Sequence, residues 1–147
     1  MAILADPVHH VKTPQRINQA MAERGIDALM LPLHVAPQGL QAVVLQGLRQ
    51  LQNLNGFAVT VPHKTSMVGL CDELTPEAVR MGAVNVVRRT SQGRLIGGNL
   101  DGEGFLQGLR NNGIEPSGSR AFLAGAGGAA RAIAFALAKA GVRRLTL

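Results

Sequence analysis

The sequence predicts an α/β protein in two parts: a first unit whose sheet is mainly parallel, and the beginning of a second α/β unit. Three observations lead to this prediction. Short apolar segments alternate with longer segments whose apolar residues have helical spacing, proline or glycine punctuates them, and the same alternation starts afresh after residue 119. Strands that alternate with helices favour a parallel sheet, because each helix carries the chain back before the next strand begins.

The first unit is expected to begin with strand, helix, strand, helix and strand. These elements are residues 1–5, 13–24, 26–33, 38–51 and 57–61. Thr13 and Pro14 have the pattern of an N-cap followed by proline at the first helical position, and Gly25 is expected to end that helix. Pro62 stops the third strand, since proline has no N–H group to donate to a sheet.

The following elements are expected to complete the first unit, over residues 1–113, and to open the second, over residues 119–147. They are a helix over 75–81, a hairpin of strands 85–89 and 94–97, a helix over about 102–109, a strand over 120–123, a helix over 129–140 and a strand over 142–147. Pro116 and Gly118 mark the connector between the units. A nucleotide-binding sheet needs more strands than the second unit supplies, so we expect the chain to be a fragment or a truncated product.

Composition narrows the functional classes. The formal net charge is +6, but the 15 lysines and arginines are scattered, and a chain with no Trp, no Tyr and four Phe has no aromatic platform for stacking on bases. We therefore expect no nucleic-acid partner and a modest attraction for anionic small molecules. No apolar run approaches the ~20 residues of a membrane span, and no signal peptide is visible. The single cysteine, Cys71, is expected in the core and excludes an internal disulfide, which fits a cytoplasmic location.

A glycine-rich turn opens the second unit. Residues 125–130, G-A-G-G-A-A, follow a predicted strand and precede a predicted helix, which is the context that a turn for NAD or NADP requires. Gly125 permits a tight turn, Gly127 lets a pyrophosphate approach the backbone, and Ala130 replaces the third glycine of the usual motif. The cofactor-binding candidates are Gly125, Ala126, Gly127, Gly128 and Ala129. An ordinary tight turn is the alternative, and the residue that would choose between NAD and NADP lies past Leu147.

Polar side chains gather where the third strand ends. Thr60, His63 and Lys64 fall at or beyond the carboxyl end of that strand, where ligands bind in α/β proteins. A lysine at this position is either a catalytic group or a solvated loop charge, and the local sequence leaves both interpretations open. His34 and His63 have no cluster of ligand-type residues around them, so no metal site is expected.

Five stretches carry further information: D-P-V-H-H-V-K-T-P (6–14), A-V-T-V-P-H-K (58–64), G-A-V-N-V-V (82–87), G-N-L-D-G-E-G-F (98–105) and G-A-G-G-A-A-R-A (125–132). In order and spacing they resemble the shikimate dehydrogenase family, whose corresponding motifs are G-x-P-x-x-H-S-x-S-P, N-V-T-x-P-x-K, G-A-x-N-T, G-x-N-T-D-x-x-G and the cofactor loop. The resemblance covers nearly the whole chain. It implies an α/β substrate domain followed by a Rossmann domain, with the active site in the cleft between them.

The resemblance implies an oxidoreductase of aromatic amino acid biosynthesis that moves a hydride reversibly between NADP or NAD and the secondary hydroxyl of a cyclic hydroxy acid. The family's lysine and aspartate, which hydrogen-bond the reacting hydroxyl, correspond to Lys64 and Asp101, and its hydroxyl-binding residues correspond to Asn85 and Thr60. Each has a plainer alternative. Asp101 precedes a helix and would serve as its N-cap, and Asn85 and Thr60 could simply satisfy backbone groups.

The sequence departs from the family where the substrate carboxylate is expected. The resemblance places Val11 and Thr13 at the family's two serines and Ala58 at its strand asparagine, so two of the three side chains cannot hydrogen-bond. Each lost bond to a charged group costs ~1.5–3 kcal/mol. We therefore expect an altered substrate, with Lys12 or His10 as a substitute cation. A non-catalytic protein that retains the fold and binds a nucleotide or another ligand is the alternative.

Overall fold

Two sheets organise the chain, a six-stranded sheet and a separate two-stranded sheet. Both belong to a computed structural model that describes all 147 residues. The strands are β1 (Ala2–Ala5), β2 (Leu31–His34), β3 (Gly56–Val59), β4 (Glu73–Leu74), β5 (Val86–Arg89), β6 (Leu95–Gly98), β7 (Arg120–Phe122) and β8 (Arg144–Thr146). The α-helices are α1 (Thr13–Glu23), α2 (Leu40–Ala42), α3 (Pro76–Met81), α4 (Asp101–Asn111) and α5 (Gly128–Lys139).

The order of the large sheet is β2-β1-β3-β5-β6-β4. β1 runs parallel to both β2 and β3, and β4 runs parallel to β6, whereas β5 is antiparallel to β3 and to β6. The mainly parallel sheet and the β5–β6 hairpin are therefore confirmed. β7 and β8 pair in parallel with α5 between them, as expected for the second unit.

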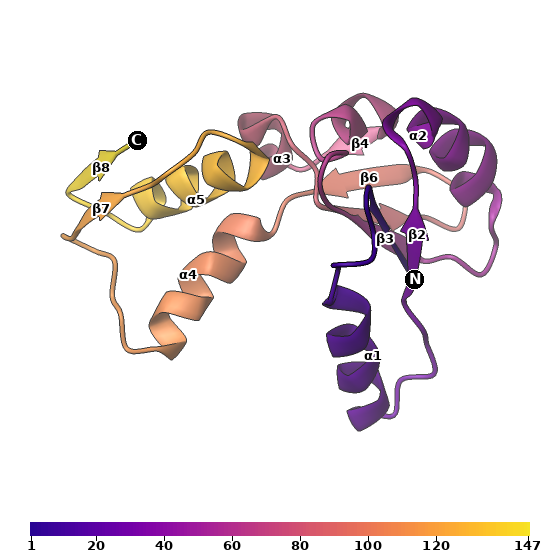
Figure 1. Ribbon diagram of the computed structural model, residues 1–147, viewed down its shortest axis with the longest axis horizontal. Helices are drawn as coiled ribbons and strands as arrows, with labels where there is room; N and C mark the ends of the chain where they lie inside the picture. The colour runs from indigo at the N-terminus through magenta and orange to yellow at the C-terminus, as the bar shows by residue number, and fades with distance from the viewer.

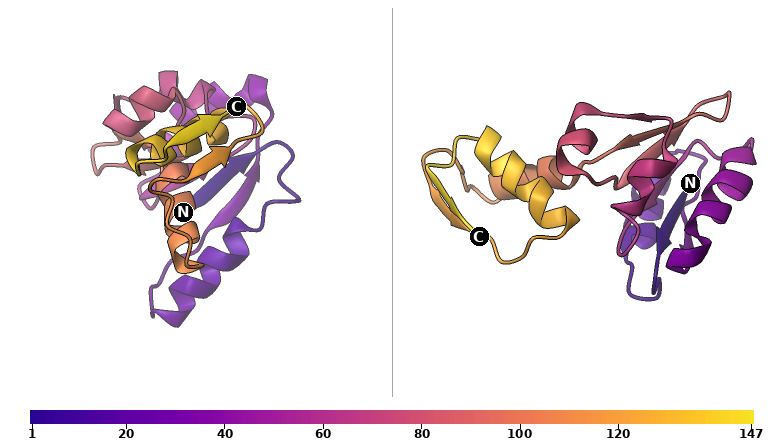
Figure 2. Two further views of the ribbon diagram at one scale, coloured as in Figure 1. Left: turned by 90° about the vertical axis from the view of Figure 1, so that its left-hand side faces the viewer. Right: turned by 90° about the horizontal axis from the view of Figure 1, so that it is seen from above.

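The molecule has two lobes (Figure 1). The view from above in Figure 2 shows α5 with the β7–β8 sheet at one end and α2 with the large sheet at the other. Helix α4 leads the chain from the large sheet toward the small lobe and packs along α5. No helix combines the length and the apolar character that crossing a membrane would require.

The core lies on both faces of the large sheet and is aliphatic apart from Phe57. On one face the strands pack against Leu40, Val44 and Leu48, together with Met67 and residues of α3. On the other face α1 covers a smaller cluster of Ile3, Met21 and Met30. The remaining phenylalanines are exposed, so the composition correctly predicted a core built from aliphatic side chains.

Most of the predicted strands are shorter in the structure than expected. The segment 26–33 forms a strand only over Leu31–His34, because Asn18 of α1 binds both backbone groups of Met30. Its side chain accepts a hydrogen bond from the Met30 N–H at 2.7 Å and donates one to the Met30 carbonyl at 3.0 Å. β3 ends at Val59, although Thr60 still donates its N–H to the Leu4 carbonyl.

The helix predicted over 38–51 is irregular. Short 3-10 turns, Pro37–Gly39 and Leu48–Gln50, flank α2 and a π-helical segment, Val43–Gly47. Leu40, Val44 and Leu48 still point into the core. Leu51, expected on the same face, is 46% exposed because the helical path has ended before it.

The structure contradicts two of three N-cap assignments: the expected cap Thr13 and the alternative capping role of Asp101. Lys12 occupies the N-cap position of α1, so Thr13 is the first helical residue and makes no capping bond. Leu100 is the N-cap of α4, which places Asp101 inside the helix and overturns the capping alternative for this carboxylate. Thr75 does cap α3, where its hydroxyl accepts a hydrogen bond from the Ala78 N–H at 3.3 Å.

Candidate active site

Lys64 and Asp101 meet although 37 positions separate them in the chain. Lys64 follows the turn after β3, and Asp101 is the first residue of α4, which begins where β6 ends. The Lys64 Nζ donates a hydrogen bond to the Asp101 Oδ2. Their side chains are 15% and 24% exposed, so the pair is sheltered but remains in reach of a ligand. This geometry removes the solvated-charge alternative for Lys64.

Asn85 holds the second oxygen of the same carboxylate. Its Nδ2 donates to the Asp101 Oδ1 at 2.6 Å, while its Oδ1 accepts the Leu100 N–H at 2.9 Å. The side chain of Asn85 therefore does satisfy a backbone group, as the plainer alternative holds, but it also binds the Asp101 carboxylate. One side chain fixes both the start of α4 and the orientation of the carboxylate.

Asn99 belongs to this site and was not predicted. It is 5% exposed, its Oδ1 accepts the Asp101 N–H at 3.0 Å, and its Nδ2 donates to the Ala83 carbonyl at 3.1 Å. These two bonds connect Ala83, which lies two residues before Asn85, to Asp101. An asparagine two positions before an aspartate, at a strand end, is a signal for such a local bond.

The turn that carries Lys64 is anchored by its neighbours. His63 is 1% exposed, and its Nε2 donates to the Val35 carbonyl at 2.7 Å, so this histidine is a structural anchor. The Lys64 carbonyl accepts the Val84 N–H at 2.8 Å. The Thr60 carbonyl accepts the His63 N–H at 2.9 Å, which places half-buried Thr60 at the base of the same turn.

The three departures from the family motif do not share one environment. Val11 and Ala58 are half-buried and both pack against the Ile3, Met21 and Met30 cluster beneath α1. Ala58 pairs with Val86, the residue after Asn85, so this apolar surface adjoins the polar constellation. Thr13 is exposed at the start of α1.

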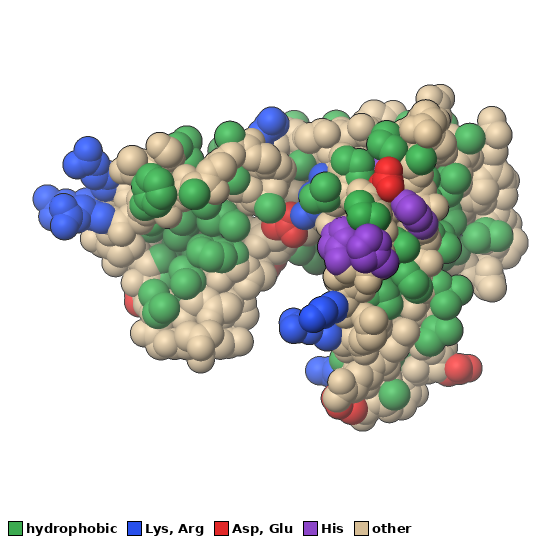
Figure 3. Space-filling view, in the orientation of Figure 1, with side chains coloured by type: hydrophobic (Ala, Val, Ile, Leu, Met, Phe, Trp, Pro, Cys, Tyr) green, Lys and Arg blue, Asp and Glu red, His purple; other side chains and the backbone are tan.

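A hollow separates the small lobe from α1, and Figure 3 shows acidic, basic and histidine side chains gathered at its upper end. Two of the chain's four histidines, His9 and His10, pack edge to face with ring centroids 5.6 Å apart. A lysine hydrogen-bonded to a carboxylate, with both side chains partly exposed, can exchange a proton with a bound hydroxyl.

The glycine turn lies next to Lys64. Gly125 has a φ of 114°, a conformation that favours glycine, and Gly125 to Gly127 are exposed. A Cβ at Gly128, the first residue of α5, would lie 3.4 Å from the Ala83 Cβ and 3.8 Å from Lys64 carbons. The N–H groups of this turn and of the first turn of α5 could hold a pyrophosphate close to the lysine.

Helix α5 packs closely against α4 at Gly102, the residue after Asp101. A Cβ at Gly102 would lie 2.5 Å from the Ala132 carbonyl oxygen and 2.8 Å from the Ala136 Cβ, which only glycine accommodates. The residue directly after the carboxylate therefore sets how closely α4 and α5 approach.

Cys71 has no part in this constellation. A Cβ at Gly97 would lie 2.7 Å from its Sγ, so the thiol packs against β6. Burial raises the pKa of the Cys71 thiol to about 11, which keeps it protonated at neutral pH. Its expected role as a small core residue fits this packing.

Comparison with known proteins connects these features to one family. Residues 3–87 match the family described as the shikimate dehydrogenase substrate binding domain. The chain is 44% identical over 147 residues to a shikimate dehydrogenase (NADP(+)) of Lysinibacillus sphaericus, covering 99% of this chain and 52% of that protein. It is equally identical to that of Rubrobacter xylanophilus, covering 100% and 51%. The chain thus spans about half the length of the curated relatives it matches.

Solved structures agree in fold. Shikimate 5-dehydrogenase from Thermus thermophilus, in complex with NADP(H) and shikimate, superposes with a TM-score of 0.89 at 35% identity, covering 98% of this chain and 54% of that one. The ligand-free 5-ketofructose reductase of a Gluconobacter species superposes with a TM-score of 0.86, also at 35% identity, covering 98% and 50%.

Proposed function

Because this chain belongs to the shikimate dehydrogenase family, we propose that it forms the substrate-binding part and the beginning of the cofactor-binding part of a nicotinamide-dependent dehydrogenase. The substrate domain is assigned to residues 1–113 and the start of a Rossmann domain to residues 119–147. The observation that carries the proposal is the Lys64–Asp101–Asn85 constellation beside the glycine turn.

The proposed reaction is the reversible oxidation of a secondary alcohol to a ketone. A nicotinamide cofactor held by the glycine turn would supply the acceptor for the hydride of the carbinol carbon. The hydroxyl proton passes to the hydrogen-bonded pair of Lys64 and Asp101, and the C=O bond forms as the O–H bond breaks. Asn85 keeps the Asp101 carboxylate aimed at Lys64, and Thr60 is assigned to a neighbouring hydroxyl of the substrate because it lies at the base of the same turn.

The residues assigned to the cofactor are Gly125, Ala126, Gly127, Gly128 and Ala129. The positive φ of Gly125 fits a tight turn, and the open space around Gly125 and Gly127 leaves room for a pyrophosphate that side chains there would fill. We infer NADP in preference to NAD, since the curated relatives act with NADP(+). A shikimate 5-dehydrogenase structure from Listeria monocytogenes was solved with NAD, so NAD is the second candidate.

The substrate is proposed to be a small hydroxy compound held differently from shikimate. Val11 and Ala58 pack into an apolar cluster and offer no hydrogen bond to a carboxylate. Each missing bond to a charged group lowers affinity roughly ten- to hundredfold. A neutral polyhydroxy ketone is the second candidate, because the 35% identical Gluconobacter relative is a 5-ketofructose reductase.

Steady-state kinetics of the full-length protein test this function. Shikimate, quinate and 5-ketofructose are compared with NADP(H) and NAD(H) over a range of pH. We expect measurable turnover of at least one of them, with shikimate used less efficiently than by a dedicated biosynthetic enzyme. Shikimate efficiency equal to that of such an enzyme would contradict the altered substrate and would place the protein in aromatic amino acid biosynthesis.

Lys64→Ala and Asp101→Asn test the catalytic assignment. Each should lower kcat by roughly 10²- to 10⁴-fold, the usual contribution of a general acid–base group. Exposed Asp27→Asn, which removes the same charge, is the matched control for Asp101. Nucleotide binding without turnover of any alcohol would instead favour a non-catalytic binding protein.

We further propose a cytoplasmic location. Its support is that Cys71 is free and the chain needs no disulfide, which suits a reducing compartment. The proposed partner is the small-molecule substrate. Fractionation of cells that express the full-length protein at native level would test the location, and recovery with the membrane pellet would contradict it.

A further inference from the structure

A second polar pocket lies at the tip of the β5–β6 hairpin. It has a volume of about 250 Å³, and no hydrophobic residue lines it. We call it the arginine pocket after Arg49, Arg89 and Arg94, which line it together with Asp72, Ser91 and Gln92. The Arg89 N–H bonds to the Asn55 carbonyl, next to the start of β3, whereas Lys64 follows the end of β3. The arginine pocket is therefore at the opposite end of the sheet from the candidate active site.

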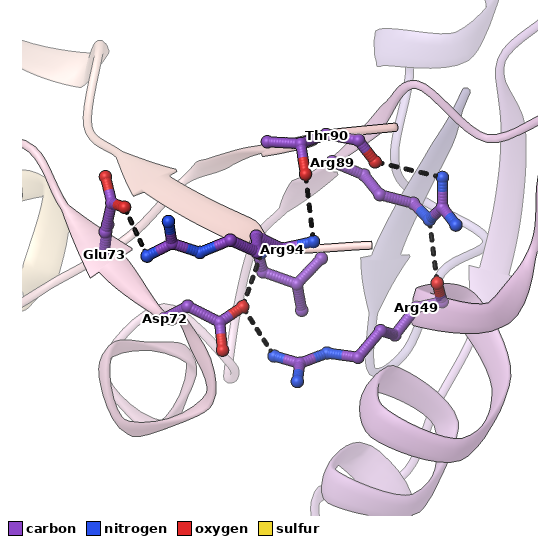
Figure 4. Close-up of polar contacts among 7 residues, drawn as sticks. Arg49, Asp72, Glu73, Arg89, Thr90 and Arg94 are labelled. Carbon is purple, nitrogen blue, oxygen red and sulfur yellow. Dashed lines mark hydrogen bonds and ion pairs between the residues drawn. The ribbon is translucent and has the colours of Figure 1, made fainter. Parts of the chain in front are cut away.

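The arginine pocket contains more positive than negative charge. Arg49 donates to the Asp72 Oδ2 at 2.8 Å, and Arg94 pairs with Glu73. Arg89 donates only to neutral carbonyls, from Nε to Arg49 at 2.8 Å and from Nη1 to Thr90 at 3.2 Å (Figure 4). Arg89 is nevertheless 8% exposed. A charge buried to this extent is unfavourable unless a counter-charge accompanies it.

Two guanidinium nitrogens in the arginine pocket lack an acceptor from the protein. The Arg49 Nε is buried and has no hydrogen-bond partner. The Arg89 Nη2 makes no hydrogen bond, in contrast to the other two nitrogens of that side chain. Buried polar groups in folded proteins nearly always have partners, so the buried Arg49 Nε calls for an oxygen acceptor. The Arg89 Nη2 reaches the pocket and is a free donor for the same occupant.

We propose that the arginine pocket binds a small oxyanion of the phosphate class. One such anion balances the excess positive charge of three arginines over two carboxylates and offers several acceptors to guanidinium groups, whose planar geometry matches phosphate oxygens. Its binding would join the Leu48–Gln50 turn, the tip of the β5–β6 hairpin and Asp72, the residue before β4. The proposal does not depend on the reaction at Lys64.

The experiment is a titration of the full chain with inorganic phosphate at constant ionic strength, with chloride as the balancing salt. Calorimetry measures binding, and thermal unfolding measures the stabilisation that follows from binding to the native state. The variants are Arg89→Gln and Arg94→Gln. Arg88→Gln is the matched control, because it removes the same charge from the adjacent, exposed position of the same strand.

We expect saturable phosphate binding in the wild type and in Arg88→Gln, and affinity weaker by roughly tenfold or more in both pocket variants. If Arg89→Gln does not fold, Arg94→Gln still decides the question, because its ion pair with Glu73 is exposed and contributes little to stability. Phosphate bound at the glycine turn would persist in every variant and cancel in the comparison. No saturable binding, or equal binding in all variants, would overturn the proposal.

A parallel titration with glucose 6-phosphate distinguishes two sources of the same chemistry. Binding at least as strong as that of inorganic phosphate would identify a phosphomonoester of a metabolite as the occupant. Weaker binding, lost in the same variants, would assign the arginine pocket to free phosphate.

Discussion

At the scale of single residues, Asp101 is held at three points. Lys64 and Asn85 bind its two carboxylate oxygens, and Asn99 binds its main-chain N–H. A carboxylate with both oxygens bonded to side chains of separate segments has little freedom to rotate. The protein itself therefore fixes its orientation, as the proposed proton transfer would require.

Asn99→Ala should weaken both stability and turnover. The substitution leaves the Ala83 carbonyl and the Asp101 N–H without partners, at a cost of about 1–3 kcal/mol in the free energy of unfolding. We expect kcat to fall more than KM changes, because Asn99 is buried and acts through the main chain of Asp101. Denaturant titration and steady-state kinetics measure the two effects, with exposed Asn53→Ala as the control. A loss of stability with unchanged kcat would show a purely structural role.

Asp72→Asn should make stability less dependent on pH in acid. A hydrogen bond from the Leu95 N–H and the neighbouring Arg49 hold the pKa of the Asp72 carboxyl below its ordinary value of 3.8. A lowered pKa means that this carboxylate stabilises the fold above 3.8 and that its contribution is lost as the pH falls through the folded-state pKa.

We therefore expect Asp72→Asn to be less stable than wild type at pH 7 and the difference to shrink as the pH drops below 3.8. Urea titrations at several pH values measure it. Asp27→Asn, in an exposed loop, should show no such convergence. A difference that stays constant in acid would contradict the assigned ionisation.

At the scale of elements, the crossing of α4 and α5 depends on one glycine of α4 and not on another. A Cβ at Gly102 would meet the Ala132 carbonyl oxygen at 2.5 Å, whereas a Cβ at Gly108, in the same helix, would meet nothing within 4 Å. One glycine is required by packing and the other is not, although the sequence presents them alike.

Gly102→Ala should destabilise the protein by about 1–3 kcal/mol, since the extra methyl forces α4 and α5 apart. The same displacement would move the glycine turn away from Lys64 and weaken cofactor binding. Gly108→Ala is the matched control and should be neutral or more stable by about 0.5–1 kcal/mol, because alanine favours a helix interior. Unfolding and cofactor titrations of the two variants check this, and equal behaviour would contradict the packing argument.

Helix and strand positions followed from apolar spacing and from proline and glycine, but several of their ends did not. Thr75 caps α3 as predicted, whereas Thr13 and Asp101 fall one residue inside their helices. A cap depends on the dihedral angles of a single residue, which the sequence pattern does not specify. β2 is short because Asn18, distant in sequence, binds Met30. Such a contact is visible only once the chain has folded.

At the scale of the whole molecule, the sequence indicated which residues lie at the candidate site better than it indicated the hydrogen bonds between them. Lys64, Asn85 and Asp101 were identified through a family resemblance, and local patterns alone left each of them with a plainer alternative. Asn99 was missed because its role consists of bonds between two loops. The arginine pocket was missed for a related reason: its arginines come from two segments separated by about forty residues, and their charges looked scattered in the sequence.

Val11→Ser combined with Ala58→Asn should raise the efficiency with shikimate. The two substitutions restore hydrogen-bonding side chains at the family's positions, and each bond to a charged carboxylate improves affinity roughly ten- to hundredfold. Because Val11 and Ala58 pack against a small apolar cluster, a modest loss of stability should accompany the gain. kcat/KM for shikimate in the full-length protein is the measurement.

Val79→Ser, at an exposed position of α3, is the control and should leave kcat/KM unchanged. If the double variant shows no improvement while it still folds and binds cofactor, the apolar surface at Val11 and Ala58 does not determine substrate choice.

The close packing of Gly102 against α5 couples the position of α5 to that of Asp101. Asp101 precedes Gly102, so a rigid rotation of α4 with α5 away from the large sheet would carry the carboxylate off Lys64 and, at the same time, draw Gly128 away from that lysine. The Lys64–Asp101 ion pair would break in such a motion. One motion would both separate the lobes and break the hydrogen bond that the proposed proton transfer uses. The proposed reaction would then proceed only while the two lobes are together.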